Sequence, residues 1–166
     1  MTDAPLRVLP VSTKSELETF IRVPYRLHEN DENWIAPLLI ERRELLDPRK
    51  NPFLRRAEVQ LWIALRGDTP VGRISAQIDP LVEQVRSAGE GHFGMIEAKD
   101  DPDVFKALFD TAEAWLREKG ALTAIGPFNL SINEEIGVLV DGRDEPPMLM
   151  MGHDHPYIAD RIAEQG

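Results

Sequence analysis

Five polar side chains stand within seven positions of this chain, between two apolar runs. They are Asn129, Ser131, Asn133, Glu134 and Glu135, in the segment GPFNLSINEEIGVLVDG at residues 126–142. Ser131-x-x-Glu134 fits a capping box, in which each side chain bonds the other's backbone donor at the start of a helical turn. That interpretation leaves Asn129, Asn133 and Glu135 unexplained, and the amides of the two asparagines can hydrogen-bond a ligand. For both of them, structural scaffold and ligand contact stay open.

Histidines and an acid stand together near the end of the sequence. His153, Asp154 and His155 occur in GHDHPY, and imidazole and carboxylate groups are metal ligands. Neighbouring ligands of this kind need a further donor, and no spacing rule brings another histidine to them. An N-cap formed by Asp154 or His155 before Pro156 explains the stretch more simply. We therefore expect no metal.

The elements that position these groups are expected to form one domain, residues 1–166. Hydrophobic residues make up 42% and charged residues 29%, which is typical of a globular protein. There is no cysteine, so disulfides, a thiolate nucleophile and cysteine-ligated zinc are excluded. We find no secretion signal and no apolar stretch near the roughly 20 residues that span a bilayer, and expect a cytoplasmic protein.

The net charge of −10 is unevenly distributed along the chain. Residues 1–75 hold 12 Lys and Arg against 11 Asp and Glu, whereas residues 76–166 hold 7 against 18. An acidic half of this size argues against nucleic acid as a partner. The basic cluster at residues 42–56 is either a solvated helix face or a surface for phosphates or anionic lipid heads.

Hydrophobic spacing and capping signals predict the secondary structure. Thr13-x-x-Glu16 is a capping box that opens a helix, and Pro24 is expected to end it. Asp101 is the expected N-cap of the strongest helix, which Gly120 ends. The other expected helices are residues 37–48 and 155–166, and the expected strands are residues 7–11, 59–65, 71–78, 92–98 and 121–128. Residues 136–142 and 146–151 are expected to be extended, with Met148, Met150 and Met151 in a core strand.

This order predicts an α/β (α+β) fold, with helices on both faces of a mixed, mostly antiparallel sheet. Its central hairpin, EVQLWIALRGDTPVGRISAQID, resembles the GNAT acyltransferase fold. The chain also contains FIRVPYRLHENDENWIAPL, ERRELLDPRKNPF, GPFNLSINEEIGVLVDG and PPMLMM. These segments resemble the bacterial ceramide synthase-like proteins, a GNAT-like group often labelled dATP pyrophosphohydrolases. No glutamate-rich Nudix-type helix supports that label.

The resemblance implies catalytic and ligand-binding residues. GNAT enzymes often place a general base where Glu97 stands, and Glu134 is the second candidate. For either one, an exposed Glu beside a helix is the alternative. Asn129, Ser131 and Asn133 would lie beside the split in the sheet where donor and acceptor meet, and would contact pantetheine or substrate there.

Tyr157 is a further candidate. The GNAT tyrosine that protonates the departing thiolate usually lies four residues before the helix-ending glycine, where Ile162 stands here. Tyr157 lies nearer the start of the helix, so we retain it as a ligand-binding pocket residue, with packing as the alternative.

The chain departs from the family pattern in its phosphate loop. GNAT enzymes bind the CoA pyrophosphate at backbone N–H groups that open the long helix. Here Asp100, Asp101 and Asp103 occupy that place and would repel it. The stretch Arg86–Gly91 matches Arg-x-x-Gly-x-Gly but precedes a strand, so we interpret it as a chance match.

Family members are longer and carry a second GNAT-like half, whereas this chain stops at Gly166, before the last two strands of the GNAT sheet. We therefore expect a truncated domain whose exposed sheet edge is covered by a dimer partner or a second lobe. The resemblance implies acyl-CoA as co-substrate and N-acylation of a long-chain, sphingoid amine. The alternative is a degenerate, non-catalytic lobe that binds or scaffolds. Peripheral contact with the inner membrane stays open.

Overall fold

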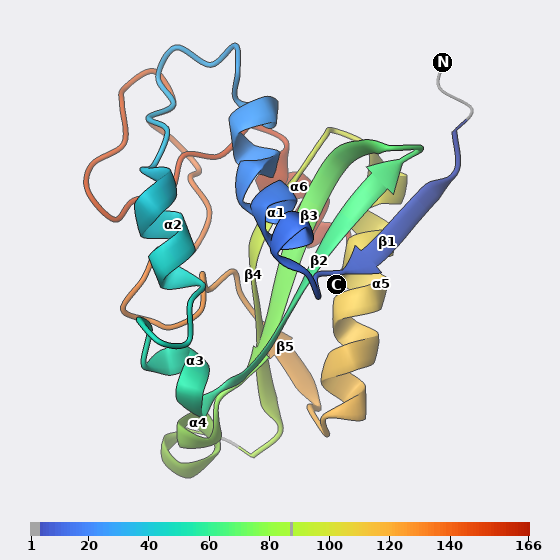
Figure 1. The fold of residues 1–166 in the computed structure, drawn as a ribbon, viewed down its shortest axis with the longest axis vertical. Coiled ribbons are helices and arrows are strands. Elements are labelled where there is room, and N and C mark those ends of the chain that lie inside the picture. Colours follow the sequence, from blue (N-terminus) through green and yellow to red (C-terminus); the bar gives the residue numbers. More distant parts are fainter. Residues whose placement is uncertain (1–3, 87) are drawn as a thin grey trace.

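The computed structural model describes residues 4–86 and 88–166, and it consists of one five-stranded sheet with helices around it (Figure 1). The strands are β1 (Leu6–Pro10), β2 (Glu58–Arg66), β3 (Thr69–Ile78), β4 (Glu90–Ala98) and β5 (Thr123–Ile125). The helices are α1 (Lys14–Leu27), α2 (Leu39–Leu45), α3 (Phe53–Arg56), α4 (Pro80–Val85), α5 (Pro102–Glu118) and α6 (Ile158–Ala163).

The sheet has the strand order β1-β2-β3-β4-β5. The first four strands pair antiparallel, and β5 pairs parallel to β4. Helix α5 packs against one face and helix α1 against the other. Phe105 and Leu108 are fully buried on the α5 side, and Phe20 is fully buried on the α1 side. The predicted fold class is therefore confirmed.

Local signals placed several elements correctly. Strands β2 and β3 form the predicted hairpin, paired from Glu58↔Ile78 to Arg66↔Thr69. Asp101 caps α5, because its Oδ1 accepts from the Asp103 amide at 3.0 Å. Gly120 follows the helix with a φ of +89°, a conformation that glycine adopts readily. Helix α2 is shorter than the expected residues 37–48.

The expectation that Pro24 ends the first helix is wrong. The capping box of Thr13 and Glu16 forms as predicted, but α1 continues through Pro24 to Leu27. Proline lacks the N–H that would bond the carbonyl of Phe20 four residues earlier. The Nη1 of Arg73, a residue only 8% exposed, donates to that carbonyl at 3.2 Å. A buried side chain from β3 thus replaces the missing helical hydrogen bond.

The expected core strand at Met148–Met151 is also wrong. Met148, Met150 and Met151 are 77%, 54% and 55% exposed, in a loop that follows two prolines. Proline cannot donate to a sheet ladder, and this segment pairs with no strand in the described ranges. The expected extended piece at residues 136–142 contributes only an isolated bridge between Phe128 and Ile136. None of the described helices has the length and apolar character needed to cross a membrane.

Exchanging Arg73 for methionine tests the substitute hydrogen bond. We expect Arg73→Met to lower the free energy of unfolding by about 3–5 kcal/mol, because it leaves Glu97 as an uncompensated charge. Adding Pro24→Ala should then recover about 1 kcal/mol, since an alanine at this position supplies an N–H to the Phe20 carbonyl. In the wild-type background, Pro24→Ala should raise the free energy of unfolding by much less, because Arg73 already donates to the Phe20 carbonyl. Urea unfolding of all four proteins measures this cycle, and an equal effect of Pro24→Ala in both backgrounds would contradict it.

Candidate functional site

A pocket of about 110 Å³ lies on the α1 side of the sheet, beside the middle of β4. Helix α1, the segment up to α2, strands β3 and β4, the loop after β5 and the segment before α6 contribute to its wall. The charged residues that line it are Arg42, Arg73, Glu97, Glu135 and Asp154. Buried charged groups are stable only when they are paired or hydrogen-bonded, so the contacts of these five residues describe the site.

An irregularity in β4 shapes the floor of the pocket. The register with β3 shifts between Arg73 and Ser75, and Met95 has a φ of +47°. The chain after β5 passes directly over this point, since a Cβ added to Gly94 would lie 1.7 Å from the carbonyl oxygen of Phe128. The Oδ1 of Asn129 accepts from the freed Met95 amide at 2.7 Å. Asn129 therefore attaches the loop to the strand.

A first polar chain runs from Asn129 across the pocket wall. The Nδ2 of Asn129 donates to Glu135 Oε2 at 3.0 Å, and Arg42 Nη2 donates to Glu135 Oε1 at 3.0 Å. The chain thus links the β4 irregularity to helix α2. Sequence reasoning left Glu135 without a role, although it stands in the same polar cluster as Asn129. In the structure, Glu135 connects the Asn129 amide to the Arg42 guanidinium.

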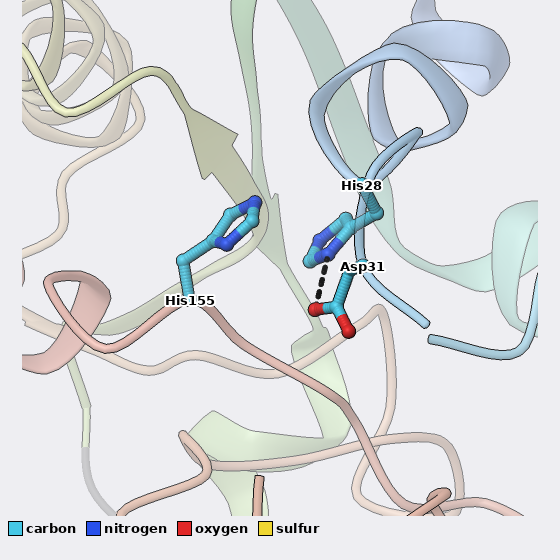
Figure 2. Close-up of side chains that lie close together, drawn as sticks. All are labelled: His28, Asp31 and His155. Atoms are coloured by element: carbon cyan, nitrogen blue, oxygen red, sulfur yellow. Dashed lines mark ion pairs between the residues drawn. The ribbon is translucent and has the colours of Figure 1, made fainter. Parts of the chain in front are cut away.

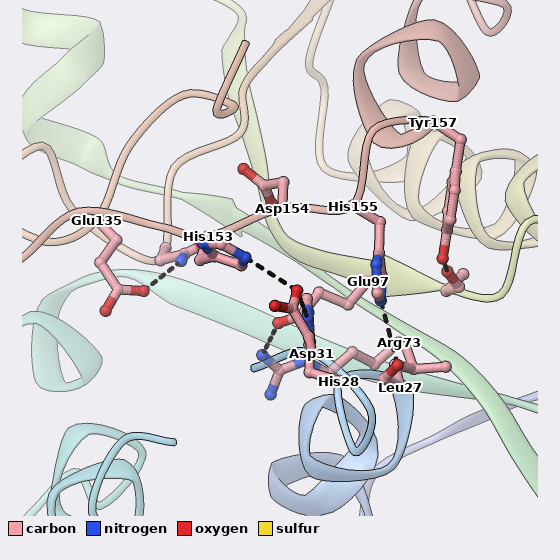
Figure 3. Close-up of polar contacts among 12 residues, drawn as sticks. Leu27, His28, Asp31, Arg73, Glu97, Glu135, His153, Asp154, His155 and Tyr157 are labelled. Carbon is pink, nitrogen blue, oxygen red and sulfur yellow. Dashed lines mark hydrogen bonds and ion pairs between the residues drawn. The ribbon is translucent and has the colours of Figure 1, made fainter. Parts of the chain in front are cut away.

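A second polar chain lies deeper (Figure 3). Arg73 Nη2 donates to Glu97 Oε1 at 2.7 Å, and Glu97 Oε2 lies 3.2 Å from His28 Nε2. His28 Nδ1 lies 3.6 Å from Asp31 Oδ2, which is 2.9 Å from His153 Nε2. These residues come from β3, β4, the end of α1, the loop after it and the segment before α6. No spacing pattern in the sequence indicated their convergence.

The charges of this chain set the ionisation of Glu97. Burial raises the pKa of its carboxyl, but the charge and hydrogen bond of Arg73 and the close approach of His28 Nε2 outweigh burial and leave the pKa below its usual value. Glu97 is therefore ionised at neutral pH. Burial is also the main cause at Asp154, where it raises the pKa, and at His155, where it lowers it.

Unsatisfied buried atoms gather in the two chains. Within residues 4–86 and 88–166, five buried side-chain atoms have no hydrogen-bond partner: His28 Nδ1, Arg42 Nε, Arg73 Nε, Glu97 Oε2 and His153 Nδ1. All five belong to the residues just described. Each such atom costs about 1–3 kcal/mol of stability, and a native protein that retains one has a reason to do so. Their concentration at one pocket marks it as the candidate functional site.

His28, Asp31 and His155 could each offer a metal-ligand atom, all within 4.8 Å of one another (Figure 2). The two imidazole rings lie face to face, however, with centroids 4.2 Å apart and planes 5° from parallel. A ligating lone pair lies in the plane of its ring, so two stacked rings cannot both direct one at the same ion. His155 Nε2 also lies 3.2 Å from the carbonyl oxygen of Leu27. The arrangement therefore supports packing, and the expectation of no metal stays a prediction.

The structure brings two of the six predicted site residues to the pocket, Glu97 and Asn129. Ser131, Asn133 and Glu134 lie outside its lining, in a turn. The expected capping box does not form, because no helix begins there. The Ser131 hydroxyl accepts from the Asn133 amide at 3.2 Å, and the Glu134 amide donates to the Ser131 carbonyl. The roles proposed for these side chains stay predictions.

Tyr157 also lies outside the pocket lining. Its hydroxyl donates to the Ala98 carbonyl at 2.8 Å, and its ring packs against the core on the α5 side. The expected N-cap at Asp154 or His155 is wrong, because Tyr157 occupies the N-cap position of α6. Asp154 Oδ2 instead accepts from the Leu139 amide at 2.7 Å. Its carboxylate thus fixes the loop that borders the pocket.

The start of α5 carries its own carboxylates. Asp101 caps the helix and accepts from Arg66 Nη2 at 2.6 Å, and Asp100 accepts from Arg161 Nε at 2.8 Å. The helix N-terminus is thus already occupied by anionic side chains. In the stretch Arg86–Gly91, Ser87 lies outside the described residues, and β4 begins at Glu90 as the expected strand context required.

The sheet order, the α1 and α5 layers and the pocket beside β4 define a protein of the GNAT fold. A tandem GNAT protein from the clavulanic acid biosynthesis pathway, solved without AcCoA, has this fold with a TM-score of 0.61. The match is 14% identical and covers 98% of this chain and 43% of that one. No family model matches the sequence.

Curated relatives define the group more narrowly. The chain is 57% identical to the bacterial ceramide synthase of Caulobacter vibrioides over 166 residues, and 48% identical to Protein YghO of Escherichia coli over 153 residues. These matches cover 99% and 92% of this chain but 43% and 39% of the relatives. The chain therefore has the GNAT fold and belongs to the bacterial ceramide synthase-like group.

Adding one methyl group at Gly94 tests the contact between β4 and the loop after β5. We expect Gly94→Ala to lower the free energy of unfolding by about 3 kcal/mol or more, because the Cβ would overlap the Phe128 carbonyl. Gly152→Ala is the matched control, since its Cβ would meet only Asp154 Oδ2, at 3.7 Å. Urea midpoints measure both, and equal midpoints would refute the close contact.

The buried hydroxyl of Tyr157 predicts an alkaline transition. Burial, with smaller effects from Asp100 and Glu97, raises its pKa to about 12. Because the unfolded phenol ionises near pH 10, the stability from this group is complete below pH 10 and is lost as the pH rises toward 12. Urea unfolding between pH 9 and 12 should show this loss in the wild type and a smaller one in Tyr157→Phe. A wild-type minus Tyr157→Phe absorbance titration that inflects at pH 10 would contradict it.

Proposed function

We propose that the protein transfers an acyl group from acyl-CoA to the nitrogen of a long-chain, sphingoid amine. Membership of the ceramide synthase-like group supports this proposal, since ceramide is such an N-acyl product. The observation that carries it is the ionised carboxylate of Glu97, which lines a pocket beside the irregular point of β4 and keeps one oxygen without a hydrogen bond.

In this reaction Glu97 is the proposed general base. The substrate ammonium loses a proton to Glu97 Oε2, and the nitrogen lone pair then attacks the thioester carbonyl carbon. The carbon–sulfur bond of the tetrahedral adduct then breaks, a second N–H proton passes to the departing sulfur, and CoA leaves as the thiol with no covalent enzyme intermediate. Glu134, the second candidate, lies outside the pocket lining, and burial raises its pKa. Its position makes Glu97 the better candidate.

The rim of the pocket suits an acceptor with an apolar chain. Ile35, Ile136 and Met151 line the pocket and are 59%, 52% and 55% exposed. Exposed apolar groups beside a charged floor complement a molecule with a cationic head and a hydrocarbon tail. In this proposal the ammonium group of the amine lies near Glu97, and its hydrocarbon tail extends out of the pocket across the apolar rim.

The chain spans about two fifths of the length of its curated relatives. In the longer proteins a second GNAT-like lobe could cover the outer edge of β5 and hold the acyl-CoA, and a dimer partner could do so here. Peripheral contact of the apolar rim with a membrane is compatible with the same geometry. These partners belong to the proposal, as does the activity of the whole protein.

A non-catalytic lobe is the second candidate function, favoured by the carboxylates at the start of α5. Asp100, Asp101 and Asp103 would repel a CoA diphosphate from that helix end. Calorimetry with CoA separates the two candidates. CoA binding in the micromolar range by this chain would exclude a lobe that no longer binds the acyl donor. The absence of a heat of binding would favour such a lobe.

Thiol release from a long-chain acyl-CoA in the presence of a long-chain amine tests the proposed function. We expect amine-dependent release by the wild type, and a kcat about 10²- to 10⁴-fold lower in Glu97→Gln. Glu113→Gln is the control, because Glu113 lies on α5 and pairs with Arg117, far from the pocket lining. Absence of release by the wild type would refute the function, and an unchanged kcat in Glu97→Gln would refute the assigned base.

A further inference from the structure

Three of the five unpartnered buried atoms lie on one line of acid–base groups, at Glu97 Oε2, His28 Nδ1 and His153 Nδ1. We propose that Glu97, His28, Asp31 and His153 form a proton relay that begins at the pocket's base and ends at a second group facing the same pocket. This inference deepens the proposed function and rests on it. Glu97 would be the catalytic residue, and His28 and Asp31 would act through it.

Figure 3 shows the residues of the relay and the contacts between them. Glu97 and His153 line the cavity, whereas His28 and Asp31 do not. The successive separations are 3.2 Å from Glu97 Oε2 to His28 Nε2, 3.6 Å from His28 Nδ1 to Asp31 Oδ2, and 2.9 Å from Asp31 Oδ2 to His153 Nε2. Catalytic contacts are commonly long before substrate binds, and each step here is short enough to close.

Aromatic packing fixes the orientation of the central imidazole. His28 lies between Trp34, at a centroid distance of 5.0 Å, and His155, at 4.2 Å, and both rings are nearly parallel to it. A ring held on both faces can rotate little about its side-chain bonds. Its two nitrogens therefore stay directed at the carboxylates of Glu97 and Asp31, which is the arrangement that a relay requires.

The electrostatics explain why Glu97 must pass the accepted proton to another group. Arg73 and His28 hold the pKa of Glu97 below its usual value, so its carboxylate is a weak final acceptor for an ammonium proton. Imidazole is the side chain whose ordinary pKa lies nearest neutrality, which suits it to carry the proton onward. The charged or titratable groups around the relay are Arg73, Asp154 and His155, in addition to its own members.

The proposed step balances without a further reactant. An N–H bond of the ammonium breaks, and the proton bonds to Glu97 Oε2 while the electron pair stays on nitrogen for the attack. Glu97 passes the proton to His28 Nε2, and His28 releases its Nδ1 proton to Asp31 Oδ2. Asp31 then passes a proton to His153 Nε2, and His153 Nδ1 can release one to the pocket. The relay thereby returns to its starting charge with the proton of each imidazole moved from Nδ1 to Nε2, and a proton transfer in the reverse direction restores the starting tautomers.

Nuclear magnetic resonance of the imidazole rings tests the connection without acyl-CoA. We expect Asp31→Asn to change the chemical shifts of the ring nitrogens in both His28 and His153, because one carboxylate faces both rings. Glu29→Gln is the control: it removes an exposed carboxylate next to His28 in sequence and should change the ring-nitrogen shifts of neither residue by a comparable amount. A change confined to His153, or equal changes in the control, would overturn the relay.

The pH dependence of thiol release supplies the second readout. His28→Gln keeps a polar side chain but cannot carry a proton, so we expect kcat to fall about 10-fold or more and its pH profile to change, with the KM for the amine nearly unchanged. Glu29→Gln should keep the wild-type profile. An unchanged profile in His28→Gln with an active wild type would refute the relay alone, whereas an inactive wild type would refute the proposed function as well.

Discussion

The buried guanidinium of Arg73 is the constraint on which the rest of the structure depends. It reaches the Phe20 carbonyl of α1, the Glu97 carboxylate of β4 and the face of the Phe20 ring, 5.0 Å away. A charge this deep is tolerated only when it is paired and hydrogen-bonded. Its partners therefore fix α1 over the sheet at one position, and the same contacts keep Glu97 ionised at the pocket. The contacts of Arg73 therefore determine both the position of α1 and the ionisation of Glu97.

The irregular point in β4 supplies the second constraint. Because Gly94 has no side chain, the chain after β5 can lie against the strand, and Asn129 takes up the amide that Met95 exposes. Glu135 and Arg42 extend this contact to α2. Two polar chains thus meet in one cavity from opposite sides. All five buried side-chain atoms without a hydrogen-bond partner belong to residues of these two polar chains.

Sequence reasoning succeeded where the cause was local. The capping box at Thr13, the cap at Asp101 and the alternation of β2 and β3 each depend on neighbouring residues, and all of them formed. It failed at Pro24 because the compensating donor comes from Arg73, which is distant in the sequence and lies on another element. The pocket position of Glu97 was inferred only through the family resemblance. His28 and His153 meet through tertiary packing, which no spacing pattern encodes.

Under the proposed function, the distribution of charge in this protein favours the acceptor half of an acyl transfer. Glu97 and His153 of its pocket are joined through His28 and Asp31, and in the proposed reaction this arrangement would accept the proton of an attacking amine. The start of α5, where a diphosphate would bind backbone amides, instead carries Asp101 as cap and Asp100 beside it. Anionic side chains that satisfy a helix N-terminus also exclude an anionic ligand from it. In the proposed acyl transfer, groups outside the start of α5 would therefore have to hold the donor's diphosphate.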